Sequence, residues 1–236
     1  MIPKILHCFW AQGPKTKLAE RCIASWRRLC PDWELREWDV ASVERALAGS
    51  PRSARFLRAA IAAKRWAAVS DWVRMWALDS FGGVYFDCDV ELVRGIDDLT
   101  DGPWVAGERK ASGDVIPNPG AGIALERGSA VARGMLDLYE RQGFDPAAEM
   151  MAVIVSNLRT VAPDLKVLPP EALSPIGADG KMRRTEATRG IHWYAMSGAS
   201  LRRRVARWLT WHGLGGVADF AVRIGKGSHE RKDNGK

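Results

Sequence analysis

The chain has 236 residues, of which 47% are hydrophobic and 27% charged, a size and composition typical of one enzyme-sized globular domain. No apolar run is long enough to span a bilayer, and the apolar stretch after Lys4 is too short for a secretory leader. The four cysteines are scattered, which excludes a close-paired zinc site and predicts buried free thiols in a reducing cytoplasm. They are Cys8, Cys22, Cys30 and Cys88.

Positive charge is concentrated at the C-terminal end. Residues 1–200 hold 26 Lys+Arg and 25 Asp+Glu, whereas residues 201–236 hold 9 and 3. We therefore expect a catalytic domain over 1–200 and a basic tail over 201–236, the tail beginning with an amphipathic helix and ending in a disordered segment. Such a helix suits an anionic membrane surface, or it docks on the domain with its basic side in solvent. No nucleic-acid-binding motif is present, so no nucleic-acid partner is predicted.

Predicted strands and helices alternate along the chain, which indicates an α/β fold with a mainly parallel sheet flanked by helices. Glycines 82 and 83 are expected to end the long central helix abruptly. In chain order the expected elements are a strand at Lys4–Phe9, a helix at Ala19–Leu29, a strand at Trp33–Trp38, helices at Val43–Leu47 and Arg55–Ala63, a long helix ending near Ser80, strands at Val84–Phe86, Trp104–Gly107 and Gly122–Leu125, helices at Val131–Tyr139 and Glu149–Val161, and short strands at Val167–Leu168 and Ile191–Trp193.

Two carboxylates follow the central predicted strand. Asp87 and Asp89 come directly after the apolar run at 84–86, and ligands of open α/β sheets gather at the carboxyl ends of strands. Paired hard oxygen ligands suit Mg²⁺ or Mn²⁺ that still carries a phosphate-bearing substrate. An Asp-x-Asp alone is also compatible with a solvated turn, but its place after a helix and a buried strand favours the metal interpretation.

Six segments carry a more specific pattern. They are IPKILHCFW at 2–10, SWRRLCPDWELREWD at 25–39, KRWAAVSDWVRMWALDSFGGVYFDCDVE at 64–91, NPGAGIALERGS at 118–129, PPEALSP at 169–175 and IHWY at 191–194. In this order they resemble the sugar-transferring enzymes of glycosyltransferase family 32. That family includes bacterial capsular-polysaccharide and outer-core transferases and, more distantly, the catalytic domains of glucosylating toxins. The region after about residue 200 is outside the resemblance.

The resemblance implies a GT-A-type fold, a nucleotide-sugar donor and a divalent cation, Mn²⁺ or Mg²⁺. Asp87 and Asp89 match the family's metal-binding acidic motif, and His192 of IHWY matches a histidine near the site. His192 is therefore the third expected metal ligand, although a lone histidine is also often a packed core residue. Asp89 is expected to act in catalysis, and Asp87 to contact the donor as well.

The resemblance also implies the donor-binding residues. Asp71 and Arg74 match positions that bind the donor sugar and are expected to be catalytic, whereas in isolation they would be a surface ion pair. Trp10 matches a position that stacks on the base, with a plain core tryptophan as the alternative. Asn118 could hydrogen-bond sugar hydroxyls, although Asn-Pro is also an ordinary turn.

We therefore expect a retaining hexosyltransferase that works in bacterial surface-polysaccharide synthesis. UDP-hexose is the favoured donor and GDP-mannose is compatible. The acceptor is a glycan or a lipid-linked glycan at the inner face of the cytoplasmic membrane, where the tail over 201–236 would assist.

Two other functions fit parts of the sequence. A phosphatase of the haloacid-dehalogenase type would use Asp87 as nucleophile, Asp89 as acid/base and a downstream lysine, for which Lys166 is the candidate. No convincing acidic pair follows that lysine. A non-catalytic membrane-binding or sugar-binding protein would depend on the tail or would lack turnover.

Overall fold

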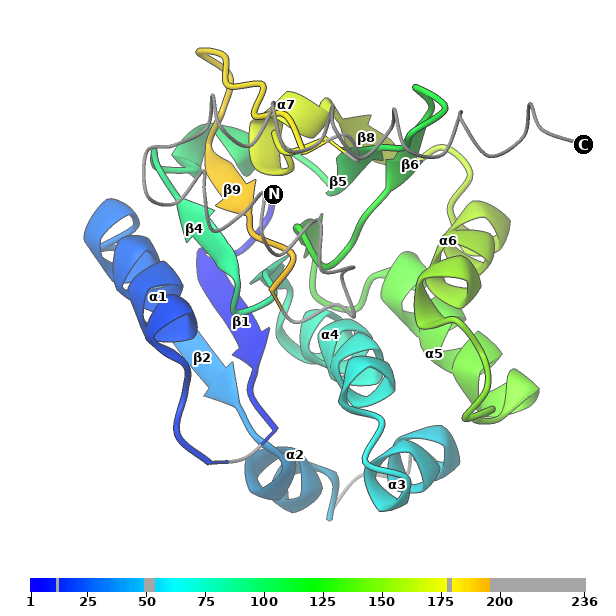
Figure 1. Ribbon diagram of the computed structural model, residues 1–236. Coiled ribbons are helices and arrows are strands. Elements are labelled where there is room, and N and C mark those ends of the chain that lie inside the picture. Colours follow the sequence, from blue (N-terminus) through cyan, green and yellow to red (C-terminus); the bar gives the residue numbers. More distant parts are fainter. Residues whose placement is uncertain (12, 49–53, 178–179, 196–236) are drawn as a thin grey trace, which may run out of the picture.

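The computed structural model describes residues 1–11, 13–48, 54–177 and 180–195, so the predicted tail over 201–236 lies outside the described residues. A seven-stranded sheet forms the centre, with strand order β2-β1-β3-β7-β5-β6 and β8 beside β5 (Figure 1). Its strands are β1 Ile5–Phe9, β2 Glu34–Trp38, β3 Gly83–Tyr85, β5 Trp104–Arg109, β6 Val115–Pro117, β7 Ile123–Leu125 and β8 Lys166–Leu168.

Most strands of this sheet point in one direction. β1 pairs in parallel with β2 and β3, and β5 pairs in parallel with β8. β7 is antiparallel to both β3 and β5, which makes β5 run in the same direction as β3. Among the described strands of this sheet, β7 and β6 run the other way. The predicted α/β class with a mainly parallel sheet is confirmed.

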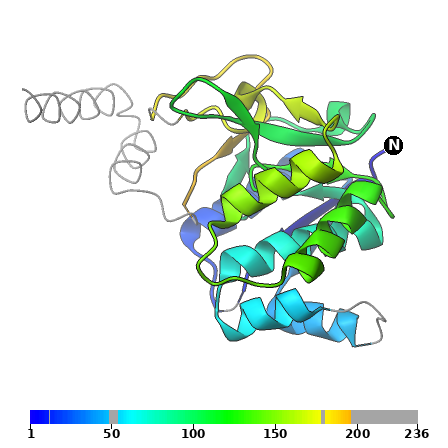
Figure 2. The same cartoon turned by 90° about the vertical axis from the view of Figure 1, so that its right-hand side faces the viewer.

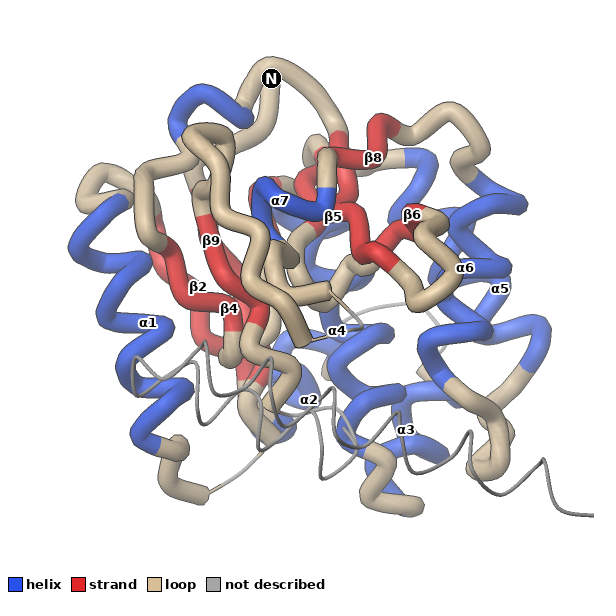
Figure 3. Tube along the Cα trace, turned by 45° about the horizontal axis from the view of Figure 1, so that its top comes forward, coloured by secondary structure: helices blue, strands red, loops and turns tan. Residues whose placement is uncertain are grey.

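Helices cover both faces of the sheet. Helices α3 to α6 lie side by side over one face, and α1 lies on the other (Figures 2 and 3). The helices are α1 Lys17–Leu29, α2 Val40–Leu47, α3 Arg55–Ala62, α4 Trp66–Phe81, α5 Ala130–Gln142, α6 Met150–Val161 and α7 Pro170–Leu173, with a short 3₁₀ turn at Asp97–Leu99.

Alternation along the strands explains the two cores. Leu6 and Cys8 of β1 pack with α1, whereas Phe9 packs with α4, because successive strand residues point to opposite faces. Similarly, Val84 faces the α1 side and Tyr85 the α4 side.

Two short strands form a separate ribbon. β4 (Val90–Leu92) pairs antiparallel with β9 (Gly190–His192), and α1 packs against β4. The sequence predicted β9 but missed β4. This ribbon matters for the site, since it brings the end of the described chain beside the residues that follow β3.

The cysteines and the apolar character of the helices can be compared with the sequence predictions. All four cysteines are buried and free, as expected. In the part of the chain that the structure describes, no helix has both the length and the apolar character needed to cross a membrane.

Gly82 ends α4 at the predicted place. Its φ is 66°, a conformation that residues with a side chain rarely adopt. A Cβ built there would also lie 2.5 Å from the backbone nitrogen of Arg127. The chain can therefore turn from α4 directly into β3 only with glycine at this position.

His7 of β1 is fully buried, and both of its ring nitrogens have a hydrogen-bond partner. Its Nε2 lies 2.8 Å from the carbonyl oxygen of Gly82, and Trp38 Nε1 lies 3.1 Å from its Nδ1. Because an indole nitrogen can only donate, Nδ1 accepts and the ring proton sits on Nε2. Burial is the main cause that lowers the pKa of His7 to about 4.

Acid is expected to destabilise the fold through His7. Between its ordinary pKa of 6.5 and about 4, the unfolded chain binds a proton that the folded chain does not. This contribution to stability is therefore present above pH 6.5 and is lost as the pH falls towards 4, by about 3 kcal/mol. Urea unfolding of the protein and of His7→Gln at neutral pH and at about pH 4 measures it. The variant should lose less stability on acidification, and an equal loss would contradict the assignment.

Candidate functional site

The two carboxylates predicted after the central strand lie at the carboxyl end of β3. β3 lies between β1 and β7, and the chain passes from it through a turn at residues 88 and 89 into β4. The turn is closed by the amide of Val90, which donates to the carbonyl oxygen of Asp87 at 3.0 Å. Asp87 and Asp89 are thereby held at the edge of the sheet where ligands of α/β folds gather.

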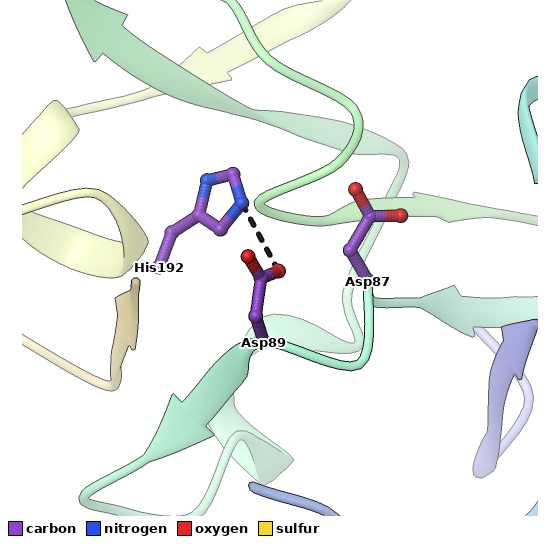
Figure 4. A group of neighbouring side chains, drawn as sticks. All are labelled: Asp87, Asp89 and His192. Atoms are coloured by element: carbon purple, nitrogen blue, oxygen red, sulfur yellow. Dashed lines mark ion pairs between the residues drawn. The ribbon is translucent and has the colours of Figure 1, made fainter. Parts of the chain in front are cut away.

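His192 joins the two carboxylates from a distant part of the chain. One ligand atom each of Asp87, Asp89 and His192 lies within 4.8 Å of the others (Figure 4). His192 Nε2 is 3.3 Å from Asp89 Oδ1. The β4–β9 ribbon causes this meeting, because Val90 pairs with His192 and the amide of Trp193 donates to the carbonyl oxygen of Asp89 at 2.9 Å.

Asp89 and His192 are almost completely buried, with exposed fractions of 2% and 5%. Asp89 Oδ2 also accepts a hydrogen bond from the amide of Ala195 at 2.5 Å. Burial disfavours the protonated form of His192, but the nearby carboxylates of Asp89, Asp87 and Glu108 outweigh it and raise the pKa of His192. Several carboxylates therefore surround one imidazole at this site.

This donor set fits a divalent cation. Two carboxylates from one turn and an imidazole from a distant segment offer oxygen and nitrogen ligands of the kind that Mn²⁺ accepts. Mg²⁺ prefers oxygen ligands and would use mainly the two carboxylates. The ring nitrogen of His192 that faces the carboxylates is Nε2, 3.3 Å from Asp89 Oδ1 (Figure 4). The concentration of negative charge in a buried place also calls for a counter-ion.

Arg74 connects the helix to the acidic turn. Its guanidinium donates to Asp71 Oδ1 on its own helix and, at 2.8 Å, to Asp87 Oδ1. It also lies over the ring of Tyr85, 4.8 Å from the centroid. Asp71 and Arg74 thus meet Asp87, and Arg74 is buried between two carboxylates, so the pair is not the surface ion pair considered as the alternative.

Burial dominates the electrostatics of this group. It raises the pKa of Asp71 to about 6, although Arg74 opposes the shift. Burial also works against the charge of Arg74, but Asp87 and Asp71 outweigh it and raise the pKa of the guanidinium. The side chain of Asp87 is the most exposed of the three, at 27%, against 12% for Asp71 and 3% for Arg74.

Trp10 lies at the same edge of the sheet. It follows β1 directly, and β1 pairs with β3 in a register that places His7 beside Tyr85. Trp10 is partly buried against the core, and its indole nitrogen has no hydrogen-bond partner among the described residues. This position is compatible with stacking on a base as well as with core packing.

Asn118 is fully buried, and its side-chain amide is hydrogen-bonded to other residues of the protein. Its Nδ2 donates to Glu108 Oε2 at 2.8 Å, and its Oδ1 accepts from the amides of Gly120 and Ala121 at 3.1 and 3.2 Å. Sequence reasoning did not single out Glu108. Glu108 directly follows the predicted strand at 104–107, and this position at the carboxyl end of a strand was the signal available for it.

The phosphatase interpretation finds no support in the placement of its lysine. Lys166 is exposed on β8, whereas Asp87 follows β3, and both β7 and β5 lie between these strands. Three strand spacings amount to about 14 Å, too far for a lysine that must contact a phosphorylated Asp87.

Comparison with known proteins bears on the same region. Residues 16–106 match the protein family described as "Glycosyltransferase sugar-binding region containing DXD motif". Among solved structures, "PaToxG Glycosyltransferase" is 18% identical with a TM-score of 0.49, covering 69% of this chain and 70% of that chain. A glycosyltransferase involved in the glycosylation of the major capsid of PBCV-1 is 14% identical with a TM-score of 0.49, covering 87% of this chain and 98% of that chain. No curated protein matches the chain.

Proposed function

We propose that this chain is a glycosyltransferase that moves a hexose from a nucleotide-sugar donor to a glycan or lipid-linked acceptor, since residues 16–106 match a glycosyltransferase sugar-binding region containing a DXD motif. The observation that carries the proposal is the meeting of Asp87, Asp89 and His192 at the carboxyl edge of the sheet. The α/β arrangement agrees with the GT-A type that the resemblance implies.

Asp87, Asp89 and His192 would hold Mn²⁺ or Mg²⁺. When bound, such a cation neutralises the charge that grows on the diphosphate leaving group as the glycosidic bond breaks. The buried carboxylates of the site would otherwise repel that diphosphate. We therefore expect transfer to require a divalent cation.

The donor would lie between the carboxyl end of β1 and helix α4. Trp10 would stack on the base, which favours UDP-hexose over the also compatible GDP-mannose. Arg74 donates to Oδ1 of Asp71, and the second carboxylate oxygen, Oδ2, would accept hydrogen bonds from sugar hydroxyls. Arg74 would keep both Asp71 and Asp87 in place, and its Nε has no partner among the described residues.

We propose transfer with retention of anomeric configuration, by front-face attack. The acceptor hydroxyl forms the new bond to the anomeric carbon while the bond to the phosphate oxygen breaks, and its proton passes to the departing phosphate. No covalent nucleophile is assigned. The protein contributes mainly by positioning both substrates and by preorganised electrostatics.

A panel of nucleotide sugars with Mn²⁺, scored by thermal shift and by donor hydrolysis, tests the function. One donor should stabilise the protein and be hydrolysed, and chelation with EDTA should remove both effects. NMR of the released or transferred sugar would report retention. Absence of binding and of hydrolysis across UDP and GDP donors would reject the proposal.

The tail over 201–236 is proposed to hold the enzyme at the inner face of the cytoplasmic membrane, where a lipid-linked surface polysaccharide would grow. Its 9 Lys+Arg against 3 Asp+Glu support this proposal. Deleting residues 201–236 should weaken binding to vesicles that contain anionic lipid while donor hydrolysis in solution persists. Equal vesicle binding with and without the tail would reject the membrane role.

A further inference from the structure

Beside the candidate cation site, β5 pairs first with β7 and then with β6, and the chain between these two partner strands leaves the sheet. Val105 and Gly107 lie two residues apart on β5, but they pair with Ile123 and Pro117, which lie six apart. Four extra residues are therefore accommodated between β6 and β7. Both ends of the interruption bond to Ala106, which accepts from the amide of Asn118 at 2.7 Å and donates to the carbonyl oxygen of Gly122 at 2.8 Å. We name residues 118–122 the 118–122 loop.

The 118–122 loop is buried throughout, so its backbone polar groups need partners inside the protein. The side chain of Asn118 supplies them, because its Oδ1 accepts from the amides of Gly120 and Ala121. The orientation of this amide is set in turn by Glu108 Oε2, to which Nδ2 donates at 2.8 Å. Glu108 thus acts on the loop through one hydrogen bond.

The other side of the loop touches Asp87. The amide of Asp87 donates to the carbonyl oxygen of Gly120 at 3.0 Å. A Cβ built at Gly120 would lie 2.5 Å from Asp87 Oδ2, so only a glycine lets the loop approach the carboxylate this closely. Contacts therefore run without a gap from Glu108 through Asn118 and Gly120 to Asp87.

Burial of the Glu108 carboxylate is energetically unfavourable. The side chain of Glu108 is 7% exposed, and its ion-pair partner is Lys110, whose Nζ is 4.0 Å from Oε1. A buried carboxylate with one short hydrogen bond and one distant ion pair is poorly compensated, which argues for a role beyond stability. Interruptions of a strand next to a site commonly re-aim a side chain.

We propose that Glu108 is a positioning residue for the candidate cation site, since it orients Asn118 and thereby the 118–122 loop that holds Asp87. This inference rests on the proposed function, in which Asp87 is a ligand. Replacing outer partners of metal ligands lowers metal affinity by about 10- to 100-fold, and we expect Glu108→Ala to fall in this range. Glu108→Gln retains an oxygen that accepts from Asn118 and should bind close to the unmodified protein.

Two measurements on the full chain test the proposal. Hydrogen exchange without metal reports the amides of Gly120 and Ala121, which should lose protection in Glu108→Ala and keep it in Glu108→Gln. The free-Mn²⁺ signal in electron paramagnetic resonance, recorded with UDP, reports cation affinity. The control is Glu171→Gln, which removes a carboxylate that binds Arg109, the next residue of β5. It should leave both readouts unchanged.

The outcomes separate the inference from the function. If the unmodified protein binds Mn²⁺ and Glu108→Ala binds it equally well, the inference is wrong and the function stands. Equal damage from Glu108→Gln and Glu108→Ala would also overturn it, because Glu108 would then act through its charge. Failure of the unmodified protein to bind Mn²⁺ with UDP would reject the function itself. If Glu108→Ala does not fold, Gly120→Ala tests the same contact at the loop, and unchanged Mn²⁺ affinity in that variant would overturn the inference.

Discussion

Replacing Asp89 with asparagine is expected to reduce metal-dependent donor hydrolysis by at least about 100-fold while the protein stays folded. Asparagine has the shape of aspartate and keeps an oxygen that can accept from the amide of Ala195. It removes the negative charge that a divalent cation needs. The measurements are donor hydrolysis at saturating Mn²⁺ and the melting temperature of the variant.

Asp114→Asn is the matched control for this prediction. Asp114 is an exposed carboxylate in the hairpin between β5 and β6, where it accepts from the hydroxyl of Ser112. Its replacement changes the net charge by the same amount but leaves the site intact, so hydrolysis should remain. Full activity of Asp89→Asn would remove Asp89 from the catalytic centre.

Replacing Arg74 with methionine is expected to lower the free energy of unfolding at neutral pH by about 3–5 kcal/mol. Methionine fills part of the volume but leaves Asp71 and Asp87 facing each other without their shared cation. For a domain of this size the melting temperature should fall by about 6–20 °C. Thermal and urea unfolding measure the effect.

Two further variants show that the loss comes from the unpaired carboxylates. Adding Asp71→Asn to Arg74→Met should restore part of the stability, because one of the two stranded charges is then gone. Arg189→Met removes a pair with Asp98, whose side chain is 55% exposed, and should cost less than about 1 kcal/mol. Equal losses from Arg74→Met and Arg189→Met would contradict the buried-pair interpretation.

Long or strongly patterned elements could be predicted from the sequence alone. Helix α4 follows from helical spacing of apolar residues and ends at Gly82 as predicted, and β1 and β2 were located within one residue. The Asp-x-Asp after β3 was visible for the same reason, since strand, turn and carboxylates are contiguous. Here the determining interactions are local, so the residues that cause the structure are also neighbours in sequence.

Two short strands, β4 and β6, were not predicted, although four other strands of three residues were. β4 and β6 form because β9 and β5 offer them backbone partners from distant or separate segments, which no pattern within β4 or β6 shows. The 118–122 loop likewise depends on Glu108, ten residues earlier along the chain, and its sequence reads as an ordinary Asn-Pro turn.

Sequence by itself therefore predicted the α/β class, and it contained the residue types that meet at the candidate site. Only the tertiary structure decided their relations: that Arg74 bridges Asp71 and Asp87, that Glu108 bonds to Asn118, and that His192 meets Asp89. The physical reason is distance along the chain. Asp89 and His192 are 103 positions apart, so their contact arises from the pairing of β4 with β9 and from no pattern within either segment.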